Sequence, residues 1–243
     1  LGALLLLAGA AWTFLIWQSM KAAGEDPMGL TMVLAAPLFI AIWVVMMVAM
    51  MFPTAAPMIL TFATIHRQKR QRGQAFVPTW VFVSSYLLIW TAFGVLAYGL
   101  AMGAQLLIEG STWLMNNAAR FGGGVLVLAG LYQLSPLKRS CLSKCRSPLD
   151  FILSSWREGY GGAFNMGLRH GFYCLGCCWL LFLILFPLGI MNVAAMAIIT
   201  LLIFAEKSTA LGPKVAQAAS AALIAYGLTA VFVPGVLPTM RQS

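Results

Sequence analysis

Residues 31–65 read TMVLAAPLFIAIWVVMMVAMMFPTAAPMILTFATI, an uncharged and mostly apolar stretch that decides the fold class. A helix needs about 20 apolar residues to cross the hydrocarbon core of a membrane. As one straight helix this stretch would run about 50 Å at 1.5 Å per residue. Pro53 and Pro57 lie inside it, and proline kinks or breaks helices. We therefore predict a membrane span that is broken or bent at these prolines.

Further apolar stretches on both sides predict an all-α, polytopic transmembrane helical bundle of about seven spans, in which residues 31–65 form the second. Of the 243 residues, 61% are hydrophobic and only 9% are charged, whereas soluble domains carry about 25% charged residues. No long polar segment remains to build a soluble domain, so residues 1–243 are interpreted as a single transmembrane domain. The other predicted spans are Leu4–Trp17, Val77–Ile108, Trp113–Leu134, Gly162–Pro187, Met191–Ala205 and Leu211–Val233.

The basic residues predict the orientation, because Lys and Arg concentrate in cytoplasmic loops. If the spans alternate, most of them fall in or beside two loops, 66–76 and 135–161, while the acidic Glu25, Asp26 and Glu109 fall on the other side. The pattern predicts a multi-pass protein of the lipid bilayer with a cytoplasmic N-terminus and an external C-terminus. The net charge of +9 then reflects contact with anionic headgroups, and nucleic acid is not an expected partner.

Residues 165–178, NMGLRHGFYCLGCC, contain the clearest candidate site and lie in the fifth predicted span. Around a helix, Cys174, Cys177 and Cys178 fall within about 80° of His170. One imidazole with several soft sulfur atoms favours Cu(I), with Zn(II) as the alternative. Two other interpretations remain open: a Cys174–Cys177 redox pair and ordinary packing by small side chains.

Four methionines, Met46, Met47, Met50 and Met51, precede Pro53 in the second predicted span. Met47 and Met51 share one face of a helix, and the other two flank it. Thioethers bind Cu(I) well and Zn(II) poorly, which favours copper. The methionine cluster and the span-five cysteines both fall near mid-membrane depth in the predicted topology, so they could meet, but the sequence does not decide whether they do. Broken helices at membrane depth usually line a site. Flexible packing in an apolar core is the simpler alternative.

Cys141 and Cys145 lie one helical turn apart in the basic loop 135–161. Neighbouring cations are expected to lower the pKa of both thiols, so this pair is a candidate for the point where metal arrives; a disulfide or two free thiols are the alternatives. Glu206 is expected to form an interfacial ion pair with the adjacent Lys207, with a proton or metal ligand as the alternative. The candidate metal ligands are His170, Cys174, Cys177, Cys178, Met47, Met50, Met51, Cys141 and Cys145.

Several short motifs occur together in this chain: MMVAMMFPTAAP (46–57), YQLSPLK (132–138), CLSKCRSP (141–148), GLRHGFYCLGCC (167–178), MN (191–192) and EK (206–207). Jointly they resemble a bacterial family of unknown function described as predicted metal-binding integral membrane proteins. The resemblance runs from Met32 to Lys207 and departs at Ala195, where an aromatic residue is expected. It implies several helical spans in the bacterial inner (cytoplasmic) membrane and a metal site drawn from Met, His and Cys, but no reaction.

The functional prediction is a protein that binds metal, copper first and zinc second, for delivery or storage. No paired carboxylates lie inside a span and no phosphate-binding loop is present, so an enzyme is not expected. The alternative is a non-catalytic accessory subunit that packs a larger membrane protein complex, since Gly94, Gly99, Gly103 and residues 122–124 would permit close helix contacts. A thiol redox protein is a weaker third interpretation.

Overall fold

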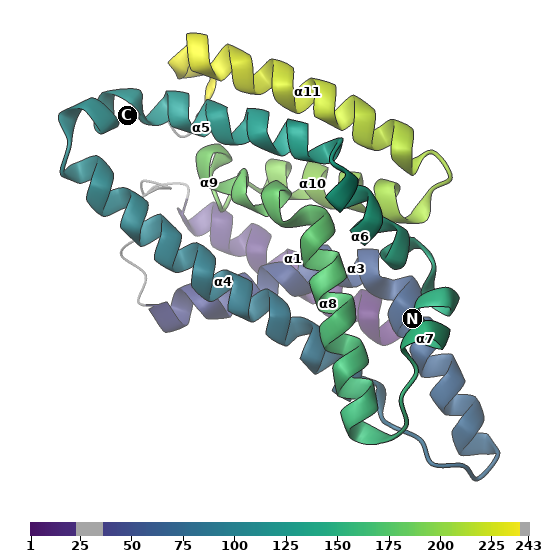
Figure 1. Ribbon diagram of the computed structural model, residues 1–243. Helices are drawn as coiled ribbons and strands as arrows, with labels where there is room; N and C mark the ends of the chain where they lie inside the picture. The colour runs from purple at the N-terminus through teal and green to yellow at the C-terminus, as the bar shows by residue number, and fades with distance from the viewer. Residues whose placement is uncertain (23–35, 239–243) are drawn as a thin grey trace.

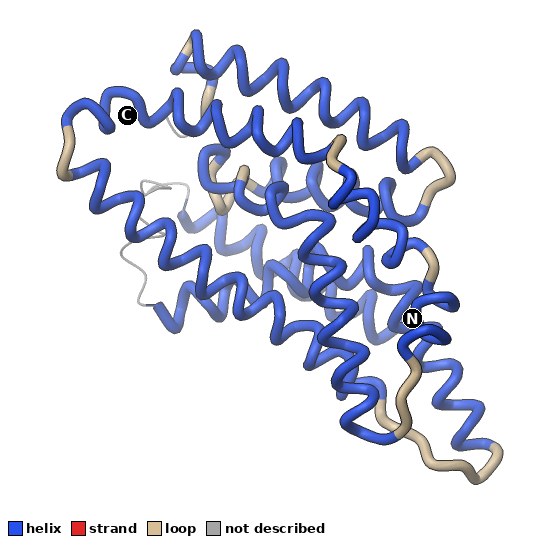
Figure 2. Tube along the Cα trace, in the orientation of Figure 1, coloured by secondary structure: helices blue, strands red, loops and turns tan. Residues whose placement is uncertain are grey.

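The computed structural model describes residues 1–22 and 36–238, and all regular structure in these ranges is helical (Figures 1 and 2). This confirms the all-α class. Glu25, Asp26 and residues 31–35 of the predicted second span lie outside the described ranges. The helices are α1 (Gly2–Ala22), α3 (Ala36–Gln71), α4 (Thr79–Glu109), α5 (Thr112–Gln133), α6 (Pro136–Arg146), α7 (Pro148–Ser155), α8 (Gly159–Leu183), α9 (Leu185–Leu188), α10 (Val193–Ser208), α11 (Gly212–Phe232) and the 3₁₀ turn η1 (Pro234–Val236).

Five helical segments among the described residues are long and apolar enough to cross a membrane, which is consistent with a membrane protein: α1, α3, α4, the α8–α9 segment and α11. Helices α5 and α10 cover the remaining two predicted spans. With 16 residues, α10 is about 24 Å long, shorter than a hydrocarbon core of about 30 Å. Helix α5 carries Asn116, Asn117 and Arg120 in its first half, which lowers its hydropathy. The count of about seven spans stays a prediction.

The predicted break at the prolines is absent, because α3 continues from Ala36 to Gln71 through Pro53 and Pro57. A proline at position 53 removes the N–H that would donate to the carbonyl of Ala49. The indole Nε1 of Trp12, on α1, donates to that carbonyl at 3.0 Å instead. A neighbouring helix thus satisfies the acceptor that the proline leaves free, as is usual for prolines in transmembrane helices.

The helices form a bundle in which α3 and α8 lie near the centre (Figure 1). Helix α3 packs against α1 on one side and against α4 and α10 on others, while α8 packs against α4 and α6. Helix α11 lies along α5 at the edge of the bundle (Figure 1). Large apolar side chains remain exposed on the outside, for example Leu6, Trp80 and Phe232, as expected for surfaces in contact with lipid.

The predicted glycine contacts divide into close and open positions. A Cβ on Gly123 would lie 2.8 Å from the carbonyl oxygen of Gly227 on α11, so these two glycines set the close α5–α11 approach. Gly94 lies directly against the indole of Trp43. By contrast, a Cβ on Gly99 or Gly103 would meet no atom within 4 Å. Gly94 and Gly123 therefore permit close contacts between helices of this chain, whereas Gly99 and Gly103 face no neighbouring atom within it.

The basic loop 135–161 is largely helical rather than irregular. Helix α6 begins where the Ser135 side chain accepts from the backbone N–H of Lys138 at 3.1 Å, with Pro136 in the first turn. It packs against α8. The ion pair of Lys69 Nζ with Glu158 Oε1, at 2.7 Å, joins the end of α3 to the residue before α8. The two predicted basic loops therefore lie at the same end of the molecule.

Candidate metal site

Helix α8 carries the predicted stripe of side chains into the interior of the bundle. His170, Cys174, Cys177 and Cys178 are all buried. Gly171 permits this placement, because a Cβ there would lie 2.9 Å from Cβ of Ile89 on α4. The close approach of the two helices positions side chains of α4 directly over this face of α8.

The thiol of Cys174 is the point where α3, α4, α8 and α10 meet. Lys207 Nζ, on α10, donates to its Sγ at 3.0 Å. The hydroxyl of Tyr86, on α4, lies 3.2 Å from the same Sγ, and Sδ of Met51, on α3, lies 3.9 Å away. The site therefore joins one thiol, one thioether, one phenol and one ammonium group at a position closed to solvent.

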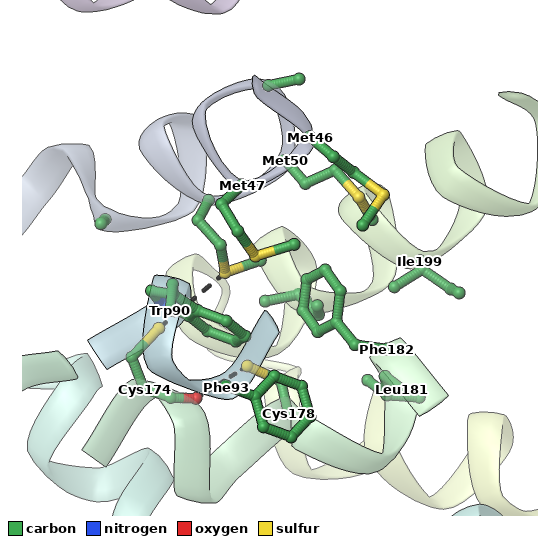
Figure 3. Close-up of a cluster of buried hydrophobic side chains, with 14 of the residues drawn as sticks. Met46, Met47, Met50, Trp90, Phe93, Cys174, Cys178, Leu181, Phe182 and Ile199 are labelled. Carbon is green, nitrogen blue, oxygen red and sulfur yellow. Dashed lines mark hydrogen bonds between the residues drawn. The ribbon is translucent and has the colours of Figure 1, made fainter. Parts of the chain in front are cut away.

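The methionine cluster meets the cysteines through one of its members. All four methionines are buried, and it is Met51 that contacts Cys174. Figure 3 shows Met47 beside Trp90, on the side of Cys174, whereas Met46 and Met50 point toward Ile199. The span-two and span-five clusters therefore meet in the fold, which the sequence left open, and Met51 is the thioether in contact.

The two cysteines of α6 have different surroundings. Cys145 is buried, and hydrogen bonds with the Cys174 and Cys177 thiols, followed by burial, raise its pKa well above the usual value. Cys141 is half-buried and packs closely against Gly176 of α8. A Cβ added to Gly176 would lie only 2.7 Å from Sγ of Cys141. Burial raises the pKa of Cys141. The expected lowering of both pKa values is therefore wrong, because burial, and for Cys145 also the neighbouring thiols, outweigh the effect of the cations of the loop.

The other two thiols of α8 face its own backbone. Cys177 Sγ and Cys178 Sγ donate to the carbonyl oxygen of Cys174 at 3.1 and 2.7 Å. All five cysteines are free thiols, so neither the α6 pair nor the Cys174–Cys177 pair is joined here. Cys145, Cys174, Cys177 and Cys178 together form a buried group of thiols that we refer to as the thiol cluster.

His170 lies one helical turn before Cys174 and is 2% exposed. Its ring is surrounded by aromatic rings, with centroids at 5.3 Å for Tyr86, 5.6 Å for Phe151 and 5.9 Å for Phe82. Neither ring nitrogen has a hydrogen-bond partner among the described residues. A buried imidazole without a partner is costly, so His170 is chemically available to a ligand.

The predicted ion pair of Glu206 with Lys207 is not formed. Glu206 Oε2 instead accepts from Lys138 Nζ, on α6, at 2.7 Å, and both side chains are buried. Gln133 Oε1 also accepts from Lys138. Consecutive residues of a helix point about 100° apart, so Lys207 faces a different neighbour, the Cys174 thiol. Its ammonium group also donates to Oγ1 of Thr54, on α3, at 3.4 Å.

Sequence reasoning missed Tyr86, Lys138 and the contact of Lys207 with a thiol. A lysine beside a carboxylate at the end of an apolar span is a recognisable pattern, but it does not identify the partner. Tyr86 carries no local pattern, and the motif that ends at Lys138, YQLSPLK (132–138), does not identify a role for it. Their roles arise from contacts between helices that are far apart in the sequence.

The donor chemistry of this region fits Cu(I). Within the described ranges, no three His, Cys, Asp or Glu side chains are arranged as a ready site for a metal ion. Soft thiolates and thioethers are nevertheless the donors that Cu(I) prefers. Met51 and Cys174 are in contact, the buried Cys145 thiol lies beside the Cys174 thiol, and the unpartnered His170 lies one turn away.

Comparison with known proteins gives one match. Residues 40–230 match the model of a family described as PpoB2, copper chaperone. The matched range contains all the residues that form the thiol cluster and its contacts. No curated protein and no solved structure matches this chain.

Proposed function

This chain belongs to the PpoB2 family of copper chaperones, and from that premise we propose that it is a membrane protein that binds Cu(I) as cargo for delivery or storage. In this proposal the chain catalyses no reaction. Copper is bound inside the helical bundle and passed to an acceptor. The metal is therefore a transported ion rather than a resident cofactor.

The contact between Met51 and Cys174 is the observation that carries the proposal. It brings a thioether from α3 within 3.9 Å of a thiol from α8. Residues 123 positions apart supply two soft donors to one buried point, and Cys145 adds a third from α6. Cu(I) takes such donors, whereas Zn(II) binds thioethers poorly, so this donor set favours copper over zinc.

The different exposure of the cysteines supports a direction of loading. Cys141 is half-buried on the surface of α6, Cys145 is buried one turn further, and Cys174 is 0% exposed. We infer that copper first meets Cys141 and then passes to Cys145 and Cys174. Met51, Cys177 and Cys178 would help to hold it there, and Met47 and His170 are further candidate donors. Met50 points toward Ile199 and would not contribute (Figure 3).

The membrane placement is part of the same proposal. We place α5 and α10 in the bilayer beside the five long apolar segments, which gives about seven spans. The basic end of the molecule, with α6, would face the cytoplasm of a bacterial inner membrane. Copper would then load from the cytoplasmic side.

Metal content tests the proposal. The full chain, purified in mild detergent and analysed by mass spectrometry for metals, is expected to carry about one copper per chain, because the donor set is built around one thiol. Cys174→Ser is expected to lose most of this copper. Met51→Leu is expected to weaken Cu(I) binding about tenfold, measured by competition with a chromophoric chelator. Met115→Leu, at an exposed position of α5, is the matched control and should bind as the wild type does.

Three results would contradict the proposal. Copper that remains in Cys174→Ser would show that the thiol cluster does not hold it. Zinc in place of copper would show that the Met51 thioether does not select the metal, because Zn(II) binds thioethers poorly. A chain without metal that copurifies with a membrane complex would favour the accessory subunit instead.

A further inference from the structure

Lys207 places a positive charge where a metal cation is proposed to bind. Its Nζ lies 3.0 Å from Cys174 Sγ, and the residue is 7% exposed. An ammonium group is not a metal ligand, because it has no lone pair. The positive charge of Lys207 repels any cation that binds at Cys174, so the position of this lysine requires an explanation.

No acidic side chain cancels the charge of Lys207 among the residues that the structure describes. The adjacent Glu206 is engaged by Lys138 at 2.7 Å, and Lys207 takes part in none of the ion pairs. Its second contact is the neutral hydroxyl of Thr54 at 3.4 Å. The interior around the thiol cluster therefore carries one ammonium charge that is opposed only by thiols.

The effect of this charge on a bound metal depends on the charge of the metal. Coulomb repulsion by a fixed positive charge is twice as large for a divalent as for a monovalent ion at the same distance. The lysine can turn away from Sγ when a metal arrives, but Lys207 lies on a buried face of α10 and cannot reach solvent freely. In an interior of low dielectric constant, the difference between the two ions remains large.

We propose that Lys207 makes the thiol cluster selective for a monovalent soft cation, Cu(I), against divalent ions such as Zn(II). This inference rests on the proposed copper function and adds the residue that determines its specificity. The thiols of the cluster by themselves admit both Cu(I) and Zn(II), and the Met51 thioether supplies only part of the preference for copper. The charge of Lys207 penalises the divalent ion more strongly and so separates the two.

The affinities of the full chain for Cu(I) and for Zn(II), measured separately in detergent by competition with chelators, test the inference. Lys207→Gln removes the charge and is expected to raise the affinity for Zn(II), relative to that for Cu(I), by at least about tenfold. Lys207→Arg keeps the charge and should keep the wild-type ratio. Lys214→Gln, at an exposed position on α11, is the matched control for the loss of a lysine and should leave the ratio unchanged. If Lys207→Gln does not elute as a folded protein in gel filtration, Lys207→Leu provides the neutral variant.

The outcomes separate the inference from the function on which it rests. A wild-type chain that binds Cu(I), together with an unchanged ratio in the neutral variants, overturns the role of Lys207 and leaves the copper function standing. A shift in Lys207→Arg as large as that in Lys207→Gln also overturns it, because the effect would then follow from shape and not from charge. A wild-type chain that does not bind Cu(I) overturns both.

Discussion

Buried polar side chains are the most informative residues of this protein. Lys138 and Glu206 form an ion pair in the interior, and Lys207 contacts a thiol one position further along α10. Ionisable groups inside a membrane protein are costly and usually functional. Of the two lysines, Lys138 is neutralised by Glu206, whereas Lys207 has no carboxylate partner among the described residues. This difference supports the proposed role of the Lys207 charge in metal binding at the thiol cluster.

Cys145 and Cys141 are expected to differ in their effect on copper binding. The Cys145 thiol is buried beside the Cys174 and Cys177 thiols, whereas Cys141 lies half-buried against the backbone of α8. Cys145→Ser should therefore weaken Cu(I) binding at equilibrium by about tenfold or more, and Cys141→Ser by less than about threefold.

Competition with a Cu(I) chelator measures both affinities. Cys141→Ser is expected to slow the loading of copper in a stopped-flow experiment while it leaves the final occupancy nearly unchanged. Equal losses of affinity in the two variants would show that Cys145 is not part of the binding site.

Among the helices, α6 contributes to the site although it belongs to a basic loop. Its buried face presents Lys138, Leu142 and Cys145, and Arg146 donates to the carbonyl oxygens of Glu206 and Thr209. These contacts hold α6 against α8 and the end of α10. A surface segment of a membrane protein thus supplies both a thiol and the partner of a buried carboxylate.

The continuity of α3 depends on α1 through a single hydrogen bond. Trp12→Phe removes the donor to the carbonyl of Ala49 and is expected to lower the free energy of unfolding by about 1–2 kcal/mol. Hydrogen exchange should rise at the amides that follow Ala49. Trp17→Phe, at a half-exposed position on the same helix, is the control and should have a smaller effect on both measurements.

A double-mutant cycle identifies the cause. Pro53→Ala restores a backbone N–H that can donate to the carbonyl of Ala49, so Trp12→Phe should cost less in that background. An equal cost in both backgrounds would show that Trp12 stabilises the protein by packing and not by replacing the missing hydrogen bond.

The whole molecule has one basic end. The ion pair between Lys69 and Glu158 joins the last turn of α3 to the start of α8, and Figure 1 shows α7 and the end of α3 close together there. The bias of Lys and Arg predicts that this end faces the cytoplasm. Under the proposed function, copper would then reach Cys141 from the cytoplasmic side.

Labelling with a membrane-impermeant thiol reagent tests the orientation. Gln74→Cys lies in the loop after α3, and Glu109→Cys lies at the end of α4; both positions are exposed. We expect Glu109→Cys to react from outside intact cells and Gln74→Cys only after permeabilisation, because one span separates them. Reaction of both from the same side would contradict the predicted topology.

Much of the fold followed from consecutive residues. Apolar length and the shortage of charge predicted the long apolar helices, because helix formation and membrane burial depend on the local sequence, but they did not predict α6 and α7 in the basic loop. The stripe of His170, Cys174 and Cys177 could likewise be found from the helical period alone. The break at Pro53 was predicted from the same local rule and is absent, because a hydrogen bond from Trp12, outside that local window, satisfies the freed carbonyl.

The composition and surroundings of the site were decided by packing. The sequence indicates that thiols, thioethers and lysines are present on particular helices, but not which of them meet. Contact of Cys174 with Met51, Tyr86, Lys207 and Cys145 requires α3, α4, α6, α8 and α10 to converge. The pKa of Cys145 and the pairing of Glu206 with Lys138 differ from expectation for the same reason. Hydrogen bonds and charge interactions act through space, so only the tertiary arrangement determines the partner of each group.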